Sequence, residues 1–344
     1  MIIAADIGGT KTNVALLEPP REVADASKAS VLIARAKYQS SQHGSLTAIL
    51  SDFLSTYDIS PRSVRRVCAG IAGPVVEGHV ETTNLPWQVD AAEIKSTLGV
   101  GAVTLINDLE ATAERAATLT LADVFVLNRG RRPAGALTNG AVIAAGTGLG
   151  IALLHPVDGA WWPVASEGGH VDFAPRNALE MDLLQFLQLR HRRVSDERVL
   201  SGPGLVAIYE FLVGRKEEAP NAEVAAALQL PDADAPRIVS EAALEGRCPV
   251  ANRALDLFVS VYGAVAGNLG LMGVSTGGMF IGGGIAPKIL ERLKTGPFME
   301  SFTNKGRLSP LLSLMPVHVI LDPDAALMGA ARRAVRLELG LVRG

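Results

Sequence analysis

Two segments of the 344-residue chain carry nearly the same pattern, and this internal repeat constrains the fold more than any other feature. Residues 2–17 and 142–154 each consist of an apolar strand, a turn rich in Gly and Thr, and a second apolar strand. Because glycine has no Cβ and tolerates positive φ, such a turn can bring several backbone N–H groups close to an anion. One such hairpin is typical of any tight turn. Its recurrence predicts a duplicated fold that holds one polyphosphate from two sides.

The composition favours small molecules as partners. Hydrophobic residues make up 48% of the chain, which is enough for packed cores, and the length favours two domains. The net charge is −3 and the basic residues are scattered, so we expect neither a nucleic-acid partner nor a membrane partner. Cys68 and Cys248 are too few for a disulfide framework or a zinc site. With no signal-peptide pattern at the N-terminus, the chain is expected to be cytoplasmic.

One apolar segment is long enough to span a bilayer, because no charged residue lies between Asp256 and Lys288. Glycines interrupt it repeatedly, and a Gly-rich turn inside hydrocarbon would leave backbone groups unpaired. The segment therefore predicts a buried helix followed by a short buried strand at Met279–Ile281.

The order of patterns predicts an α/β fold of two similar domains around a cleft. Residues 46–54 have a helical pattern, residues 64–72 a strand pattern, and residues 103–106 form a buried strand that ends at Asn107-Asp108. The repeat sets a boundary near residue 108. We expect a small domain of residues 1–108 with a C-terminal helix at about 324–344, and a large domain of residues 109–323.

A series of motifs in chain order extends over nearly the whole sequence. These are Asp6-Ile-Gly-Gly-Thr10, Asn107-Asp108, Gly146-Thr-Gly-Leu-Gly150, Glu167-Gly-Gly-His170 with the residues up to Pro175, Glu197-Arg-Val-Leu-Ser-Gly-Pro-Gly204, and Ile281-Gly-Gly-Gly284. Together they resemble the bacterial glucokinase family of the hexokinase and actin-like superfamily. The resemblance implies two ribonuclease-H-like domains, and ATP-dependent phosphorylation of glucose at the 6-hydroxyl with Mg²⁺.

Asp108 is the candidate catalytic residue, since ligands bind where the strands of an open α/β sheet end. A carboxylate there can act as general base, taking the proton of a sugar hydroxyl as its oxygen attacks the γ-phosphorus of ATP. The alternative is an N-cap for a helix that begins at Leu109. The resemblance favours the base, with Asn107 beside it as a substrate-binding residue.

Glu167 and His170 flank two glycines and are the candidate sugar ligands, because a carboxylate and an imidazole can accept and donate hydrogen bonds to vicinal hydroxyls. They lack the spacing of a zinc motif, and the alternative is a polar loop. Glu197 follows Ser195-Asp196, which also fits a helix N-terminus. The resemblance makes Glu197 a sugar ligand as well. Asn84 is a weaker candidate of the same kind, since Asn is common in loops.

On the nucleotide side, the resemblance implies that Gly8, Gly9 and Thr10 contact phosphate and that Asp6 holds Mg²⁺ through water. The second hairpin would contact the nucleotide from the other domain. The expected binding residues there are Gly146, Thr147, Gly148 and Gly150, while Gly282, Gly283 and Gly284 either lie against adenine or form a simple turn. Lys11 is given no role.

Two other functions remain open. One is a kinase for another hexose or an N-acetylated hexose in the related repressor, open-reading-frame and kinase family. Members of that family typically carry a Cys-rich zinc motif, whereas this chain has no cysteine between Cys68 and Cys248. The other is a sugar-sensing regulator with a DNA-binding segment ahead of the first strand, which here begins at residue 2. Sugar selectivity, the phosphate donor and the oligomeric state, including a homodimer, are not fixed by the sequence.

Overall fold

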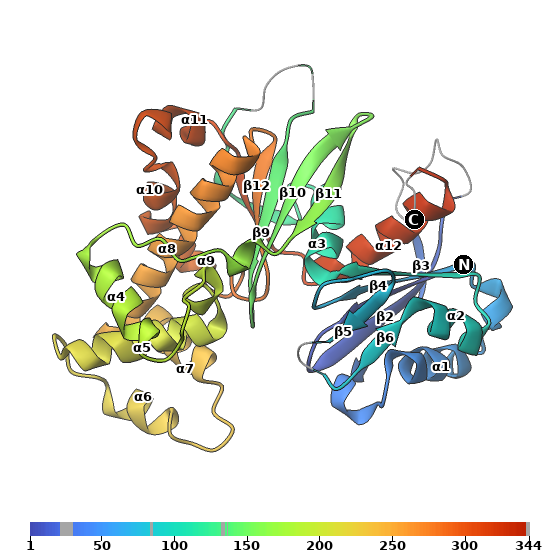
Figure 1. Cartoon of the computed structure of the whole chain (residues 1–344), viewed down its shortest axis with the longest axis horizontal. Helices are drawn as coiled ribbons and strands as arrows, with labels where there is room; N and C mark the ends of the chain where they lie inside the picture. Colours follow the sequence, from blue (N-terminus) through green and yellow to red (C-terminus); the bar gives the residue numbers. More distant parts are fainter. Residues whose placement is uncertain (21–29, 83–84, 132–134, 136, 342–344) are drawn as a thin grey trace. The chain divides into compact units, whose positions relative to one another are not determined.

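The computed structural model describes residues 1–20, 30–82, 85–131, 135 and 137–341. The chain divides into two compact units, Met1–Leu119 with Asp322–Gly344, and Thr120–Leu321. Both units are built on a mixed sheet covered by helices (Figure 1).

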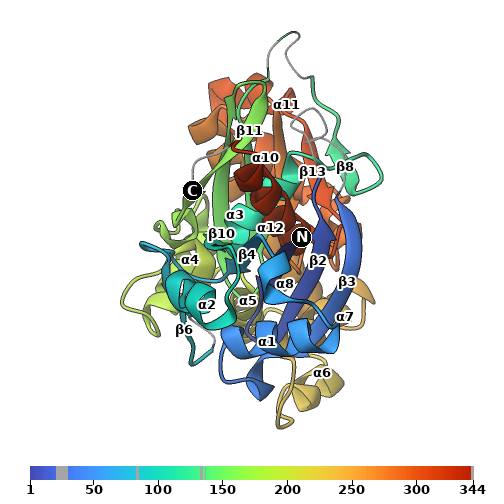
Figure 2. The same cartoon turned by 90° about the vertical axis from the view of Figure 1, so that its right-hand side faces the viewer.

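The first unit contains a five-stranded sheet in the order β3-β2-β1-β4-β7. Its strands are β1 (Ile2–Ile7), β2 (Lys11–Glu18), β3 (Val31–Gln39), β4 (Arg66–Ile71) and β7 (Ala102–Asn107). The first three strands are antiparallel, with β2 beside β3 at the edge (Figure 2), whereas β1, β4 and β7 run parallel. A small hairpin of β5 (His79–Glu81) and β6 (Gln88–Asp90) lies outside this sheet.

Both faces of the first sheet are covered, and the alternation of side chains along β1 shows how. Ile3, Ala5 and Ile7 pack with α1 (Leu46–Thr56) and α2 (Ala91–Leu98). Ile2 and Ala4 point to the other face and pack with α3 (Asp108–Ala116) and α12 (Ala325–Glu338). A strand buried on both faces is a continuous apolar run, which is why residues 2–7 contain a single charged residue.

The second unit contains a six-stranded sheet in the order β11-β10-β9-β12-β13-β8. Its strands are β8 (Val124–Asn128), β9 (Gly140–Ala145), β10 (Leu149–Val157), β11 (Ala160–Ser166), β12 (Gly278–Gly282) and β13 (Val317–Ile320). From β11 to β13 the strand order and directions repeat those of the first sheet, with β8 added antiparallel at the edge. The predicted duplication is therefore present in the topology.

Helices surround the second sheet and form the largest apolar cluster of the molecule. They are α4 (Ala178–Gln188), α5 (Gly202–Arg215), α6 (Ala222–Ala227), α7 (Ala235–Leu244), α8 (Pro249–Gly273), α9 (Leu290–Leu293), α10 (Pro297–Thr303) and α11 (Ser309–Ser313). By length and composition α8 could cross a membrane, yet 72% of its most apolar stretch is buried inside the unit. The predicted buried helix followed by a buried strand is confirmed by α8 and β12.

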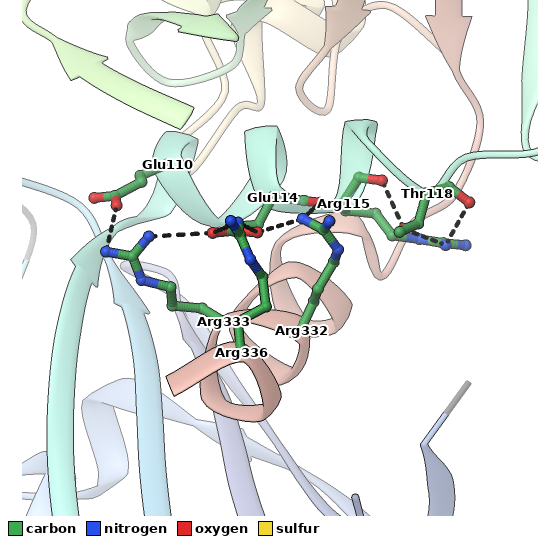
Figure 3. Close-up of polar contacts among 7 residues, drawn as sticks. All are labelled: Glu110, Glu114, Arg115, Thr118, Arg332, Arg333 and Arg336. Atoms are coloured by element: carbon green, nitrogen blue, oxygen red, sulfur yellow. Dashed lines mark hydrogen bonds and ion pairs between the residues drawn. The ribbon is translucent and has the colours of Figure 1, made fainter. Parts of the chain in front are cut away.

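A buried ion cluster joins α3 to α12 (Figure 3). The Glu114 carboxylate is fully buried and accepts hydrogen bonds from Arg332, Arg333 and Arg336. The helices approach so closely that a Cβ on Gly329 would lie 1.7 Å from a backbone oxygen of α3. These contacts place α3 in the first unit, so the contact boundary falls after residue 119, whereas the repeat put it near residue 108.

Candidate active site

Two aspartates that the sequence singled out, Asp6 and Asp108, lie at the carboxyl ends of β1 and β7. Asp6 is the penultimate residue of β1, and Asp108 directly follows β7. The Asp6 carboxylate accepts a hydrogen bond from Asn13 Nδ2 at 3.2 Å. Burial raises the pKa of the Asp6 carboxyl, the bond from Asn13 lowers it, and the negative charges of Asp108 and Asp324 raise it further. The carboxylates of Asp108 and Asp324 are thus close enough to repel that of Asp6.

Asn107, and not Asp108, is the N-cap of α3. The Asn107 Oδ1 atom accepts from the backbone N–H groups of Leu109 (2.9 Å) and Glu110 (3.4 Å), and its Nδ2 donates to the Gly73 carbonyl. Asp108 is the first helical residue, and its Oδ1 accepts from the Leu109 N–H at 2.8 Å. The capping alternative for Asp108 is therefore wrong, while the substrate contact predicted for Asn107 involves a side chain that already has partners in the fold.

The turn from Gly8 to Thr10 joins β1 to β2, and Gly9 and Thr10 are exposed. The Gly8 N–H donates to the Lys11 carbonyl at 2.9 Å, and the Gly8 carbonyl accepts from Ser40 Oγ at 2.9 Å. Gly8 does not have a positive φ, and neither do Gly146 and Gly148. At these three positions, what glycine contributes is therefore its lack of a Cβ and not a left-handed conformation.

Glu167, His170 and Glu197 come together in the second unit. His170 Nε2 lies 3.9 Å from Glu167 Oε2, and His170 Nδ1 lies 3.9 Å from Glu197 Oε1. The side chains of Glu167 and His170 are more than half exposed, whereas that of Glu197 is 27% exposed. Ser195 makes no capping hydrogen bond, so the helix N-terminus alternative gains no support from it. Two carboxylates around one imidazole can bind several hydroxyls.

Glu197 is held by the second Gly-rich hairpin. Its Oε2 accepts a hydrogen bond from the Leu149 N–H at 3.0 Å. A Cβ on Gly148 would lie 2.5 Å from the same oxygen, and a Cβ on Gly169 would lie 1.9 Å from the Leu149 carbonyl oxygen. Space requires glycine at position 169, where the nearest atoms are backbone, whereas a Cβ on Gly148 would displace the Glu197 carboxylate. These close approaches place the 146–150 turn next to the three polar side chains.

Three loops meet at one end of the second sheet. The Gly202 N–H donates to the Gly146 carbonyl at 2.8 Å, and the Ile285 N–H donates to the Ala145 carbonyl at 3.2 Å. Gly283 has a φ of +81°, and a Cβ there would lie 2.3 Å from the Ala145 oxygen. Residues 146–150, 201–204 and 282–285 therefore form one surface, which the sequence presented as separate motifs.

A cavity of about 500 Å³ opens beside this surface. Its lining includes Thr147, Arg190, Arg198, Ser201 and Pro236. Thr147 and Glu197, which also lines the cavity, are residues that the sequence predicted. Sequence reasoning gave no role to Arg198 and Ser201, although they lie within the Glu197–Gly204 motif that it used. Arg190 lies outside every motif, and no sequence signal indicated it.

Asp196 is a buried carboxyl next to Glu197, with 5% exposure. Burial, and to a lesser extent the negative charge of Asp172, raises the pKa of Asp196 to about 7.

Asn84 lies outside the described residues. Within the part of the chain that the structure describes, no group of three or more His, Cys, Asp or Glu residues is arranged to bind a metal ion.

Two topologically equivalent units, each with a Gly-rich hairpin between its first two strands, define an actin-like α/β fold of the kind found in sugar kinases. A glucokinase from an Antarctic psychrotroph has a TM-score of 0.80 and 32% identity, with 97% of this chain and 98% of that chain covered. A ROK family glucokinase from Streptomyces griseus, solved with glucose and AMPPNP, has a TM-score of 0.62 over 97% and 98% of the two chains. At 21% identity, that second likeness shows the fold alone.

Sequence comparisons identify the family. The family model described as Glucokinase matches residues 3–337. Curated glucokinases from Trichormus variabilis and Synechocystis are 39% and 37% identical to this chain, and cover 98% and 96% of it. The alignments also cover 99% and 96% of those relatives. The chain therefore belongs to the glucokinase family, and its activity is the ATP-dependent phosphorylation of glucose.

Proposed function

We propose that Asp108 is the general base of this reaction and that the acceptor is the 6-hydroxyl of glucose. Asp108 takes the hydroxyl proton while the oxygen forms a bond to the γ-phosphorus. The bond from that phosphorus to the bridging oxygen breaks, and ADP leaves with the electron pair. The supporting observation is the place of Asp108, which directly follows β7 and lies close enough to Asp6 for their charges to interact.

Glucose is proposed to bind Glu167, His170 and Glu197 through its other hydroxyls. Each carboxylate accepts hydrogen bonds and the imidazole both donates and accepts, depending on its tautomer. The bond from the Leu149 N–H fixes the orientation of Glu197 before the sugar arrives. Asn107 and Asn84 stay as proposed contacts, the second outside the described residues.

The donor is proposed to bind Gly8, Gly9 and Thr10 in the first unit, and Gly146, Thr147, Gly148 and Gly150 in the second. Gly282, Gly283 and Gly284 would lie against the base. The cavity beside Thr147, at about 500 Å³, is within the size range of pockets that bind small ligands and can hold a nucleoside. Because these residues belong to both units, the proposal requires a cleft between two domains.

Asp6 is the proposed Mg²⁺ residue, with water between the carboxylate and the ion. A single carboxylate suits this ion, since Mg²⁺ usually keeps several waters and binds one or two carboxylates together with substrate phosphates. The negative charge of Asp108 close to Asp6 also favours a cation there. When bound, Mg²⁺ would neutralise charge on the β- and γ-phosphates. We also propose a cytoplasmic location, which suits the buried, unpaired Cys68 and Cys248.

Replacement of the base tests the proposal. Asp108→Asn and Asp108→Ala should lower kcat by roughly 10²- to 10⁴-fold, the usual contribution of a positioned acid or base. Glucose affinity, measured by calorimetry, should change little. Asp90→Asn is the matched control, because Asp90 is also an aspartate at a helix start, where it caps α2. Near-normal turnover in Asp108→Ala would remove the residue from catalysis.

A further inference from the structure

A single phenol hydroxyl lies where two of the site loops begin. Tyr262 on α8 is fully buried, and its hydroxyl accepts a hydrogen bond from the Ala145 N–H at 3.2 Å. The same oxygen lies 3.4 Å from the carbonyl oxygens of Ile143 and Gly282, to which it can donate its one hydrogen. The hydroxyl therefore contacts both β9 and β12.

The strands contacted by this hydroxyl lead directly into the proposed donor loops. Ala145 is the last residue of β9 and precedes the 146–150 turn, while Gly282 ends β12 and precedes Gly283. The two strand ends also touch through the Ala145 carbonyl, which accepts from the Ile285 N–H. A displacement of the Tyr262 hydroxyl would thus move both loops together.

The ring of Tyr262 is fixed by its neighbours. Phe258 on the same helix and Phe298 on α10 contact it edge to face, with ring centroids 6.0 Å and 5.7 Å away. A Cβ on Gly263 would lie 2.0 Å from the Phe298 carbonyl oxygen, so α8 and α10 are closely packed beside the ring. Phenylalanine would fill the same space without a buried polar group, so packing alone does not account for the hydroxyl.

We infer that Tyr262 is a positioning residue for the phosphate donor, whose hydroxyl fixes the 146–150 turn relative to the Gly282–Gly284 turn. The inference rests on the donor-binding role proposed for these two turns. Of the three proposed sugar ligands, only Glu197 is joined to the 146–150 turn, through the Leu149 N–H, whereas Glu167 and His170 follow β11. The hydroxyl should therefore matter more for ATP than for glucose.

Tyr262→Phe tests the inference, since it removes only the hydroxyl. Loss of one buried hydrogen bond should raise KM for ATP about five-fold, while kcat and KM for glucose stay within about two-fold. Tyr209→Phe is the matched control. Tyr209 belongs to the same apolar cluster, and its buried hydroxyl lies beside the Cys248 thiol, away from the two strands that lead into the proposed donor turns. Tm should be similar in the two variants.

Two outcomes would overturn the inference. One is a KM for ATP in Tyr262→Phe equal to that in Tyr209→Phe. The other is an equal rise in KM for both substrates, which would indicate a general role in the core. Thr147→Ala separates this inference from the proposed donor site. If Thr147→Ala weakens ATP binding and Tyr262→Phe does not, only the role of Tyr262 fails; if neither does, the donor site itself is misplaced.

Discussion

Glu197 is the least exposed of the three proposed sugar ligands. A backbone N–H holds one of its oxygens, and the absent Cβ of Gly148 leaves room for that oxygen. Glu167 has no such support and is 61% exposed. A pre-oriented ligand loses less conformational entropy when the sugar binds. We therefore expect Glu197 to contribute more to glucose affinity than Glu167 does.

Alanine at either position should weaken glucose binding, and Glu197→Ala should weaken it roughly 10- to 100-fold, as expected when a hydrogen-bonding charge is removed. Nucleotide affinity should stay unchanged. Calorimetric titrations with glucose and with an ATP analogue would measure both. Glu241→Ala, on the exposed face of α7, serves as control. Unchanged glucose affinity in Glu197→Ala would exclude the residue from the sugar site.

Asp196 makes the stability of the fold depend on pH. Its pKa is about 7 in the folded chain against 3.8 for an ordinary aspartate, so the folded state binds the proton more tightly. The corresponding stabilisation is complete below about pH 4 and is lost as the pH rises through 7. A shift of this size corresponds to a loss on the order of 4 kcal/mol at most.

Asp196→Asn should remove this dependence, because the amide stays neutral at every pH. Its Tm relative to the unmodified protein should rise between pH 5 and pH 8. Asp172→Asn should keep the dependence but move it to lower pH, since one of the charges that raises the pKa is gone. Parallel Tm curves for Asp196→Asn and the unmodified protein would contradict the assignment.

At the scale of elements, the crossing of α3 and α12 is the tightest helix contact of the first unit. Gly329 allows it, as a Cβ there would lie 1.7 Å from the Ala111 carbonyl oxygen. The buried ion cluster of Glu114 and its arginines lies along the same contact. Because α3 begins with Asp108, a shift of this helix would also move the proposed base.

Gly329→Ala should lower the free energy of unfolding by about 1–3 kcal/mol, since the added methyl group overpacks the contact. It should lower kcat as well. Gly214→Ala in α5 is the matched control, because a Cβ there meets nothing within 4 Å and alanine favours a helix. Denaturant unfolding would give the free energy of unfolding of each variant, and an activity assay would give kcat. Equal free energies of unfolding for the two variants would contradict this prediction, because they would show that α3 and α12 can move apart without loss of stability.

The sequence predicted the elements whose signal is local. Both hairpins, α1, β4, α8 and β12 follow from periodicity, and the Asn107-Asp108 pair from the end of an apolar strand. Contacts between distant residues had no such signal. Glu114 and Arg332 are 218 residues apart, and nothing in either segment indicates the other. For the same reason, the position of α3 in the first unit and the meeting of Gly146 with Gly202 became visible only in the structure.

At the scale of the whole molecule, the proposed ligands of sugar and nucleotide are divided between the units. A ligand that contacts both units favours the arrangement in which both sets of contacts form. Glucose should therefore reduce the radius of gyration and tighten nucleotide binding, and nucleotide should reciprocally tighten glucose binding. A closed arrangement would exclude water as a competing acceptor of the phosphoryl group.

Small-angle scattering with and without glucose, together with nucleotide titrations in both conditions, would measure these effects. Glu197→Ala is the control, since it should show no compaction at the same glucose concentration. If the radius of gyration does not fall and the two ligands bind independently, the two-sided binding of the nucleotide is wrong, and the second Gly-rich hairpin is an ordinary turn.

The placement of α12 has a consequence for the order in which the molecule is made. The second unit is continuous in sequence, whereas the core of the first unit combines residues from β1 with Leu327, Ala330 and Ala334 of α12. During synthesis β1 leaves the ribosome before α12, so one face of the first sheet stays uncovered until the whole second unit and then α12 have been translated. Of the two units, the one whose strands are translated earlier is therefore the later to become complete.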